Sequence, residues 1–268
     1  MGSDFFSGMS RPASKCVFCG SQRDLTKSHV WPEWIEKILP QTATHHEHII
    51  GQFCTFVPDM EGPAFWKKVR QGHIGTRKPR NTCKECNGGW MRRIEEAAMS
   101  IMPPPLRGRP YLLETFNQRL LASFLCLVSM RVELSSHEMR AIPAQDHEWL
   151  IKYFQPPPSW KIWISRYDGS PLIDQRYTAM QIASSPDVPR GVKYCNTQVT
   201  TLVIGQLCAH MFSSTVWPDF SGYDGAELTM IWPPQRFDID LDDLPVIIET
   251  EVPWLHETIA RTSTPIPK

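Results

Sequence analysis

Four cysteines carry the strongest chemical signal in this chain of 268 residues. They form two Cys-x-x-Cys pairs, Cys16 with Cys19 and Cys83 with Cys86. Two intervening residues let both sulfurs of a pair turn toward one ion, and four thiolates are a common ligand set of a tetrahedral structural zinc. The spacing therefore predicts a Zn²⁺ site that joins two distant segments. The alternatives are unrelated thiols or a redox dithiol, although a redox motif does not need two matched copies.

A histidine and an asparagine beside these pairs suggest chemistry beyond a structural zinc. His29 lies between Ser28 and a Val-Trp-Pro segment, and Asn87 directly follows the last cysteine. A neutral imidazole, with a pKa of about 6.5, can take a proton from the water that attacks a phosphodiester. An ordinary core or surface histidine is the alternative for His29. Asn87 is interpreted either as a helix cap, a common role of asparagine, or as a metal ligand through its amide oxygen.

The chain resembles the HNH endonuclease superfamily, whose ββα-metal core is often braced by a zinc between two Cys-x-x-Cys knuckles. The resemblance rests on Cys16-Val-Phe-Cys19, Leu25-Thr-Lys-Ser-His29-Val-Trp-Pro32 and Cys83-Lys-Glu-Cys86-Asn87-Gly-Gly-Trp90-Met91. It implies an enzyme that hydrolyses DNA phosphodiester bonds, with His29 as general base and Asn87 as a ligand of the catalytic metal, Mg²⁺ or Mn²⁺. The same segments in a non-catalytic zinc module that binds nucleic acid or protein are the alternative.

The residue before the presumed base departs from the family pattern. Many members have Asp, Glu or His there as a metal ligand, whereas this chain has Ser28, a weak neutral ligand. Because Mg²⁺ prefers oxygen ligands and keeps several waters, Asn87, a substrate phosphate and water could hold the ion without a direct bond to Ser28. Asn81 is a further candidate for positioning the base. Other residues that could supply the missing ligand, or lie on a solvated surface, are His45, His46, His48 and Glu95.

The distribution of charge along the chain, unlike the net charge, favours a nucleic-acid partner. The formal net charge is zero, so no global field attracts a polyanion. Basic residues nevertheless dominate from residue 67 to 93, where Glu85 is the only acid, and acids dominate from residue 238 to 257. We expect the basic segment to contact phosphates, most simply those of DNA, although a solvated face is the alternative. The nucleic-acid-binding candidates are Lys67, Lys68, Arg70, Arg77, Lys78 and Arg80.

Composition and the N-terminus predict a cytoplasmic protein. The hydrophobic content of 41% is enough to fill a core. The N-terminus lacks a basic region followed by an apolar stretch, and no run approaches the roughly 18 apolar residues that span a bilayer. We therefore expect no membrane contact and a reducing environment. In such an environment, the remaining cysteines are expected to be ordinary buried thiols: Cys54, Cys126, Cys195 and Cys208.

The apolar pattern predicts an α+β protein of two domains. Residues 1–14 are expected to be a flexible N-terminus, residues 15–102 the HNH-like zinc module, and residues 103–268 an accessory domain of helices on an antiparallel sheet. Helices are expected after Pro32 and after Asn87, and over residues 112–134 and 146–154. Strands are expected over residues 160–166, 177–182, 198–204, 207–212, 228–232 and 246–248, with a hairpin at residues 205–206. The accessory domain could bind a second copy of the chain or a protein partner.

Overall fold

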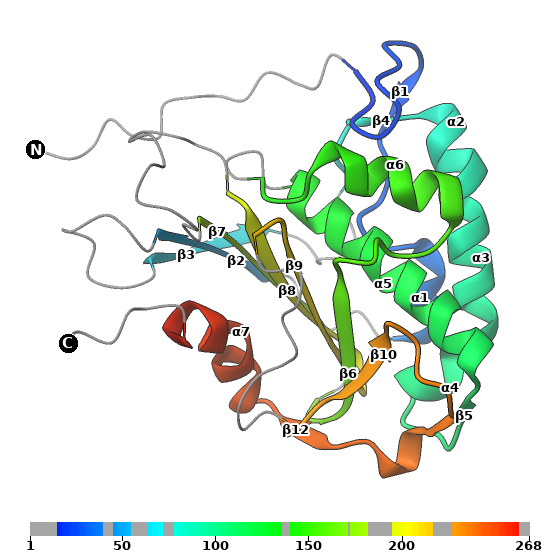
Figure 1. Ribbon diagram of the computed structural model, residues 1–268, viewed down its shortest axis with the longest axis vertical. Helices are drawn as coiled ribbons and strands as arrows, with labels where there is room; N and C mark the ends of the chain where they lie inside the picture. Colours follow the sequence, from blue (N-terminus) through cyan, green and yellow to red (C-terminus); the bar gives the residue numbers. More distant parts are fainter. Residues whose placement is uncertain are drawn as a thin grey trace, which may run out of the picture.

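A computed structural model describes most of the chain (Figure 1). The described residues are 15–39, 45–54, 64–71, 78–135, 140–170, 172–181, 195–216 and 227–262. The predicted flexible N-terminus, residues 1–14, lies outside them. Within these ranges, no helix combines the length and the apolar character that crossing a membrane demands.

The described elements confirm a mixed α+β protein. The helical elements are α1 (Glu33–Ile38), α2 (Lys84–Cys86), the π-helical turn η2 (Asn87–Met91), α3 (Arg92–Ile101), α4 (Pro103–Leu106), α5 (Thr115–Ser135), α6 (Ala144–Tyr153), the 3-10 turn η3 (Leu241–Asp243) and α7 (Glu251–Thr262). The strands are β1 (Leu25–Thr26), β2 (His45–Cys54), β3 (Ala64–Gln71), β4 (Thr82–Cys83), β5 (Leu112–Leu113), β6 (Lys161–Asp168), β7 (Leu172–Gln181), β8 (Thr197–Gly205), β9 (Leu207–Ser214), β10 (Thr229–Trp232), β11 (Ile239–Asp240) and β12 (Val246–Ile248).

Two short strands and a long helical segment form the N-terminal unit. β1 and β4 pair antiparallel, and β4 continues directly into the helical segment α2–η2–α3. In α3, Ile94, Ala98 and Ile101 are buried at helical spacing, so one face of the helix packs inward. α1 begins after Pro32, whose fixed φ suits a helix start. Both helices were predicted from the sequence, although the second begins at Lys84 and not after Asn87.

The central layer is an eight-stranded sheet in the order β10-β6-β9-β8-β7-β2-β3, with β12 on the free edge of β6. β10 pairs with the first half of β6 and β12 with its second half. From β10 to β7 all neighbours are antiparallel, as predicted. The prediction is wrong for β12, which runs parallel to β6, and it did not include β2, which runs parallel to β7. Parallel neighbours need long crossovers, and the local sequence does not encode such pairings.

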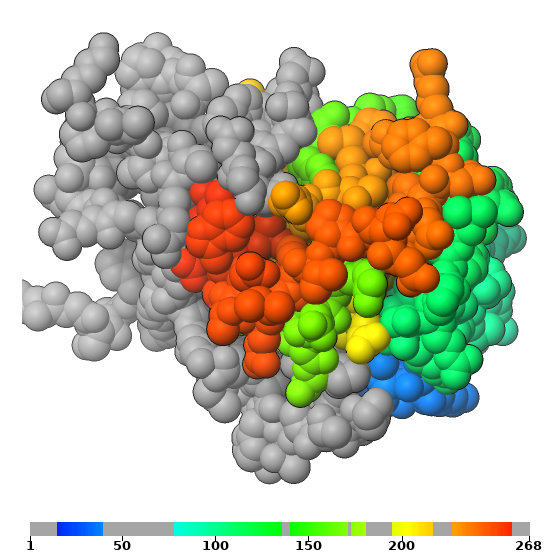
Figure 2. All heavy atoms as spheres, turned by 90° about the horizontal axis from the view of Figure 1, so that it is seen from below, coloured from blue at the N-terminus to red at the C-terminus, as the bar shows by residue number. Residues whose placement is uncertain are grey.

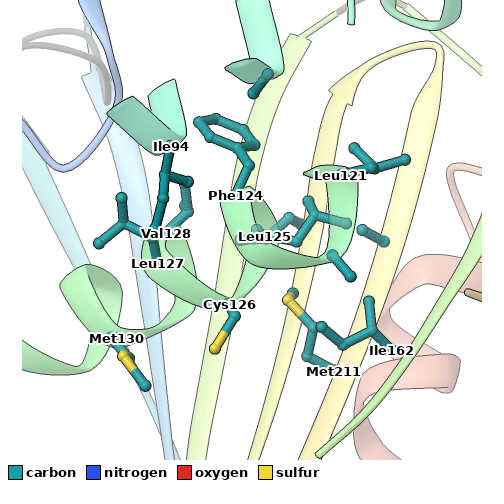
Figure 3. Packing of buried hydrophobic residues seen from close by; sticks show 14 of the residues in the cluster. Ile94, Leu121, Phe124, Leu125, Cys126, Leu127, Val128, Met130, Ile162 and Met211 are labelled. Atoms are coloured by element: carbon teal, nitrogen blue, oxygen red, sulfur yellow. The ribbon is translucent and has the colours of Figure 1, made fainter. Parts of the chain in front are cut away.

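α5 forms the middle of the molecule. It packs against α3 on one side and against β7, β9 and β10 on the other (Figure 1). Figure 3 shows Ile94 of α3 beside Phe124 and Val128 of α5, while Ile162 of β6 and Met211 of β9 approach α5 from the sheet. Helix α5 is therefore apolar on several faces because it has neighbours on several faces.

The opposite face of the sheet is covered by α7, which contacts β8 and β12 (Figure 1). His256 of α7 is buried, with its two ring nitrogens 2.8 Å from Thr178 Oγ1 and 3.0 Å from Thr201 Oγ1. Figure 2 shows the segment from β10 to α7 as a band that crosses one face of the molecule. The C-terminal helix is thus fixed to the sheet by polar as well as apolar contacts.

Packing crosses the predicted domain boundary at residue 102. One hydrophobic cluster contains Trp31 and Ile94 from before this boundary and Leu125 and Ile162 from after it. The indole Nε1 of Trp31 donates a hydrogen bond of 2.9 Å to Oε1 of Gln175 on β7. Strands β2 and β3, which precede the boundary, extend the sheet that follows it. Two independently folding domains therefore stay a prediction, while the described residues share a core.

The predicted helix over residues 112–134 begins three residues late. Leu112 and Leu113 form β5, which pairs antiparallel with β11, and the helix starts only at Thr115. The backbone N–H of Thr115 donates to Oδ1 of Asp238 at 3.1 Å, which satisfies one of the free donors at the helix start. A partner strand more than a hundred residues away thus sets where the helix begins.

The hairpin between β8 and β9 requires a glycine. Gly205 has a φ of +62°, and a Cβ there would lie 2.2 Å from the carbonyl oxygen of Leu106. The same oxygen accepts a hydrogen bond of 3.1 Å from the N–H of Gln206. The hairpin is therefore held tightly against the end of α4.

Gly205→Ala should destabilise the protein more than Gly20→Ala. Both glycines have positive φ, but a Cβ at Gly20 meets no atom within 4 Å. We expect the Gly205 variant to lose about 1–3 kcal/mol more unfolding free energy, which is the usual cost of forcing extra atoms into a packed site. Chemical denaturation of both variants measures the difference, and equal losses would contradict the close approach.

Candidate metal centre and adjoining pocket

The two Cys-x-x-Cys pairs meet in space. The sulfurs of Cys16, Cys19, Cys83 and Cys86, which we call the cysteine cluster, all lie within 4.8 Å of one another. The Cys19 and Cys83 sulfurs are 3.6 Å apart. Tetrahedral zinc with Zn–S bonds of about 2.3 Å places its sulfurs about 3.8 Å apart, so the cluster fits such an ion. The cluster could hold a metal such as zinc.

Backbone hydrogen bonds shape both pairs. In the first pair, Gly20 turns the chain with a φ of +73°, and its N–H donates to the carbonyl of Cys16 at 2.9 Å. In the second pair, Sγ of Cys83 caps the following helix by accepting the N–H of Cys86 at 3.4 Å. The N–H of Val17 donates to the carbonyl of Asn81 at 3.0 Å, which ties the first pair to the segment before the second.

The protonation chemistry of the cluster also fits a cation. Burial raises the pKa of Cys86 above its usual value, and the Cys19 and Cys83 sulfurs raise it further. The Cys86 thiol thus resists ionisation when only protons are present. A divalent cation reverses this preference, because it binds thiolates and displaces their protons.

An aromatic contact anchors the cluster to the second half of the chain. Phe18, inside the first pair, packs against Trp90 with ring centroids 5.3 Å apart and against His147 of α6 at 5.1 Å. Burial lowers the pKa of His147 to about 4, so this histidine is neutral at pH 7. The contact therefore behaves as an apolar one.

His29 lies just after β1, where the N–H of Ser28 donates to the carbonyl of Pro79 at 3.2 Å. Its Nε2 is 3.3 Å from Oε1 of Glu33, one helical turn later in α1. Burial lowers the pKa of His29, and the positive charge of Lys78 lowers it further, against the smaller opposing effect of Glu33. His29 is thus mainly neutral at pH 7, as a general base must be.

His29 and Asn87 line the same pocket, of about 440 Å³, which we call the His29 pocket. Ser28, Glu95 and Arg131 contribute to its wall as well. The volume lies within the range of about 300–1,000 Å³ typical of ligand sites. The pocket therefore brings together the two residues on which the predicted chemistry depends.

Asn87 does not cap the start of its helix. The cap is Cys83, and Asn87 has helical angles, with φ −66° and ψ −47°, inside the continuous segment α2–η2–α3. It is the first residue of the π-helical turn η2, in which Gly89 departs from helical angles. Such turns are frequent at functional sites because they redirect side chains. Of the two interpretations, the capping role is wrong, and the role in the site stays a prediction.

The structure places the residues predicted to position His29, or to supply the missing metal ligand, in different surroundings. Asn81 is buried, and its Nδ2 donates to the carbonyl of Leu134 at the end of α5, so this amide braces two segments. Its role in positioning His29 stays a prediction. Glu95 lines the His29 pocket and forms an ion pair with Arg131. The candidates His45, His46 and His48 lie on β2, where the structure describes the backbone alone.

The predicted phosphate-binding residues are only partly described. Lys78 acts electrostatically on His29, and Arg80 is exposed, with Nε donating to the carbonyl of Leu25 at 3.1 Å. Three candidates lie on β3, whose backbone alone is described: Lys67, Lys68 and Arg70. Arg77 lies outside the described residues. Phosphate contact by the whole set stays a prediction.

Arg131 is a pocket residue that the sequence reasoning missed. It lies near the end of α5, outside the predicted zinc module, and its side chain is almost fully buried. An arginine directly after the apolar stretch from Leu120 to Met130 was the available signal, because arginine is rarely buried without a specific partner.

Comparisons of the chain with family models, curated proteins and solved structures each found no match. The functional argument therefore rests on the cysteine cluster and the His29 pocket.

Cys83→Ser should release the bound metal and lower the melting temperature. Structural zinc contributes about 10–16 kcal/mol in small zinc modules, and losing about 4 kcal/mol would lower Tm by about 8–16 °C in a chain of this size. Metal content by mass spectrometry and a thermal melt check both effects. Cys195→Ser, outside the cluster, is the control. A Cys83 variant that keeps its metal and its Tm would contradict the metal centre.

Two charge-removing variants should shift the pKa of His29 in opposite directions. We expect the wild-type value, from an NMR titration without added Mg²⁺, to lie below 6.5. Lys78→Gln removes a positive charge and should raise it, whereas Glu33→Gln removes a negative charge and should lower it. Glu36 and Arg131, which also act on this histidine, stay unchanged in both variants. Shifts of the same sign would contradict the arrangement.

Proposed function

We propose that the protein is a metal-dependent HNH-type endonuclease that hydrolyses DNA phosphodiester bonds. The observation that carries this proposal is the His29 pocket, in which His29 and Asn87, far apart in the sequence, line one cavity. The topology supports it, because two antiparallel strands lead into a helix, with His29 after the first strand and Asn87 early in the helix. The cysteine cluster would hold Zn²⁺ and keep these strands and the helix in register.

His29 would act as the general base. Its neutral imidazole would accept the proton of the attacking water, and the carboxylate of Glu33, 3.3 Å away, would stabilise the imidazolium that forms. Because burial lowers the pKa of His29, the base stays competent at neutral pH. Lys78 would hold a phosphate as well as lower this pKa.

The pocket offers oxygen ligands of the kind that a hard cation requires. The amide oxygen of Asn87 would bind Mg²⁺ or Mn²⁺, with water and a substrate phosphate completing the coordination. When bound, such an ion stabilises the negative charge that develops on the phosphate and on the leaving oxygen. Ser28, which also lines the pocket, would contact the ion only through water.

Cleavage of supercoiled plasmid by purified, zinc-loaded protein tests the proposal. We expect nicking with Mg²⁺ or Mn²⁺ and none with EDTA. His29→Gln should slow nicking by about 10²–10⁴-fold, the usual contribution of a general base. Asn87→Asp, which keeps an oxygen ligand, should retain more activity than Asn87→Ala. A His29 variant that nicks plasmid at the wild-type rate would contradict the mechanism.

The alternative of a non-catalytic binding module predicts another outcome. Ser28, in place of an acidic or histidine ligand, is the observation that favours it. Such a module would show no nicking with either metal, yet would bind DNA with an affinity that falls steeply as salt rises. Filter binding across a salt series, done with the same zinc-loaded protein, separates the two functions.

A further inference from the structure

We infer that Arg131 is a phosphate-binding residue of the His29 pocket, and that the carboxylate of Glu95 holds the place of the phosphate in the free protein. The identification of the phosphate as part of a nucleic-acid backbone rests on the proposed function. The anion site itself depends only on the pocket and on the contacts of Arg131.

The first observation is a buried charge at a pocket wall. The side chain of Arg131 is 4% exposed, yet it helps to line the His29 pocket. The residues on either side of this arginine in α5, Met130 and Val132, are apolar and fully buried. Burying a charge is costly unless it is paired, so the arginine needs anionic partners within the protein or from a ligand.

The second observation is that the guanidinium uses only part of its donor capacity. It has five N–H donors in a planar fork that matches carboxylate and phosphate. Among the described residues, Nη1 pairs with Oε1 of Glu95 and Nη2 faces Sδ of Met91 at 3.5 Å. A thioether is a weak acceptor, and Nε, fully buried, has no hydrogen-bond partner in the described part of the chain. A phosphate offers the stronger acceptors that this arrangement lacks.

The third observation is the position of Arg131 relative to the presumed base. The charge of Arg131 contributes to the lowered pKa of His29, after burial and Lys78. Both residues line the pocket that contains Asn87. An anion bound to Arg131 would therefore lie within electrostatic reach of His29, where a scissile phosphate has to be.

Glu95 can leave Arg131 at little cost. Its side chain is 21% exposed at the pocket, so its carboxylate is already close to water. The neighbouring Arg92 interacts electrostatically with Glu95 and offers it a second cationic partner. Exchange of this carboxylate for a phosphate keeps the buried guanidinium paired throughout. The exchange also avoids the penalty of an uncompensated buried charge.

A phosphate titration of full-length, zinc-loaded protein tests the inference, with thermal stability as the readout and chloride of equal ionic strength as the reference. Glu95→Gln removes the competing carboxylate, so inorganic phosphate should bind at least about tenfold more tightly than to wild type. Arg131→Lys keeps a charge but not the fork, so phosphate should bind at least about tenfold more weakly. Glu249→Gln, which removes an exposed carboxylate that does not line the pocket, should bind as wild type does.

Whether Glu95→Gln binds phosphate more tightly than wild type decides whether the inference holds. Unchanged or weaker phosphate binding by Glu95→Gln would overturn the inference, as would unchanged binding by Arg131→Lys. If Glu95→Gln folds only when phosphate is present, that rescue supports the inference, since phosphate then supplies the missing partner. If it fails to fold even with phosphate, phosphate does not replace the carboxylate and the inference is wrong.

Cleavage assays on the same variants separate this inference from the nuclease proposal. If wild type cleaves no DNA with any metal but Glu95→Gln binds phosphate more tightly, the result supports the anion site and contradicts the nuclease proposal. If His29-dependent cleavage occurs while both variants bind phosphate as wild type does, the nuclease stands and the anion site falls. If Glu95 is instead a metal ligand, Glu95→Gln loses cleavage with no gain in phosphate affinity, which also overturns the inference.

Discussion

The position of α5 between two layers is the constraint on which the rest of the structure depends. Apolar residues of this helix meet α3 on one side and the sheet on the other, so its polar groups must find partners inside the protein. Arg131 pairs with Glu95 of α3. Glu133 accepts the hydroxyl of Tyr177 and the N–H of Ala141, and burial raises its pKa to about 7. These pairings couple the helix to both layers.

The candidate site follows from the same packing. The cysteine cluster brings the segment before β1 close to β4 and the helical segment, and Phe18 attaches that unit to α6. Arg131 reaches the His29 pocket from α5, and Trp31, two residues after His29, bonds to β7. The pocket is therefore supported from both halves of the chain. A truncation at residue 102 would remove part of its wall.

Local features could be predicted from the sequence, and long-range ones could not. The cysteine pairs, the hairpin at Gly205 and the strands from β6 to β10 follow from spacing, turn residues and short apolar runs. The site residues that a motif marks, His29 and Asn87, do meet in one pocket. The position of Arg131 in the His29 pocket depends on segments far apart in the chain. The same is true of the parallel pairings of β2 and β12. No local pattern encodes those neighbours.

The path of β2 has a consequence for the order in which the molecule is assembled during synthesis. All four cysteines leave the ribosome within the first third of the chain, before α5 and the strands from β6 onward exist. A metal can therefore close the loop between Cys19 and Cys83 early, with β2 and β3 inside that loop. β2 then presents an unpaired edge until β7 is made, and such edges attract other strands. Between the synthesis of β2 and the synthesis of β7, the nascent chain is therefore exposed to incorrect strand pairing.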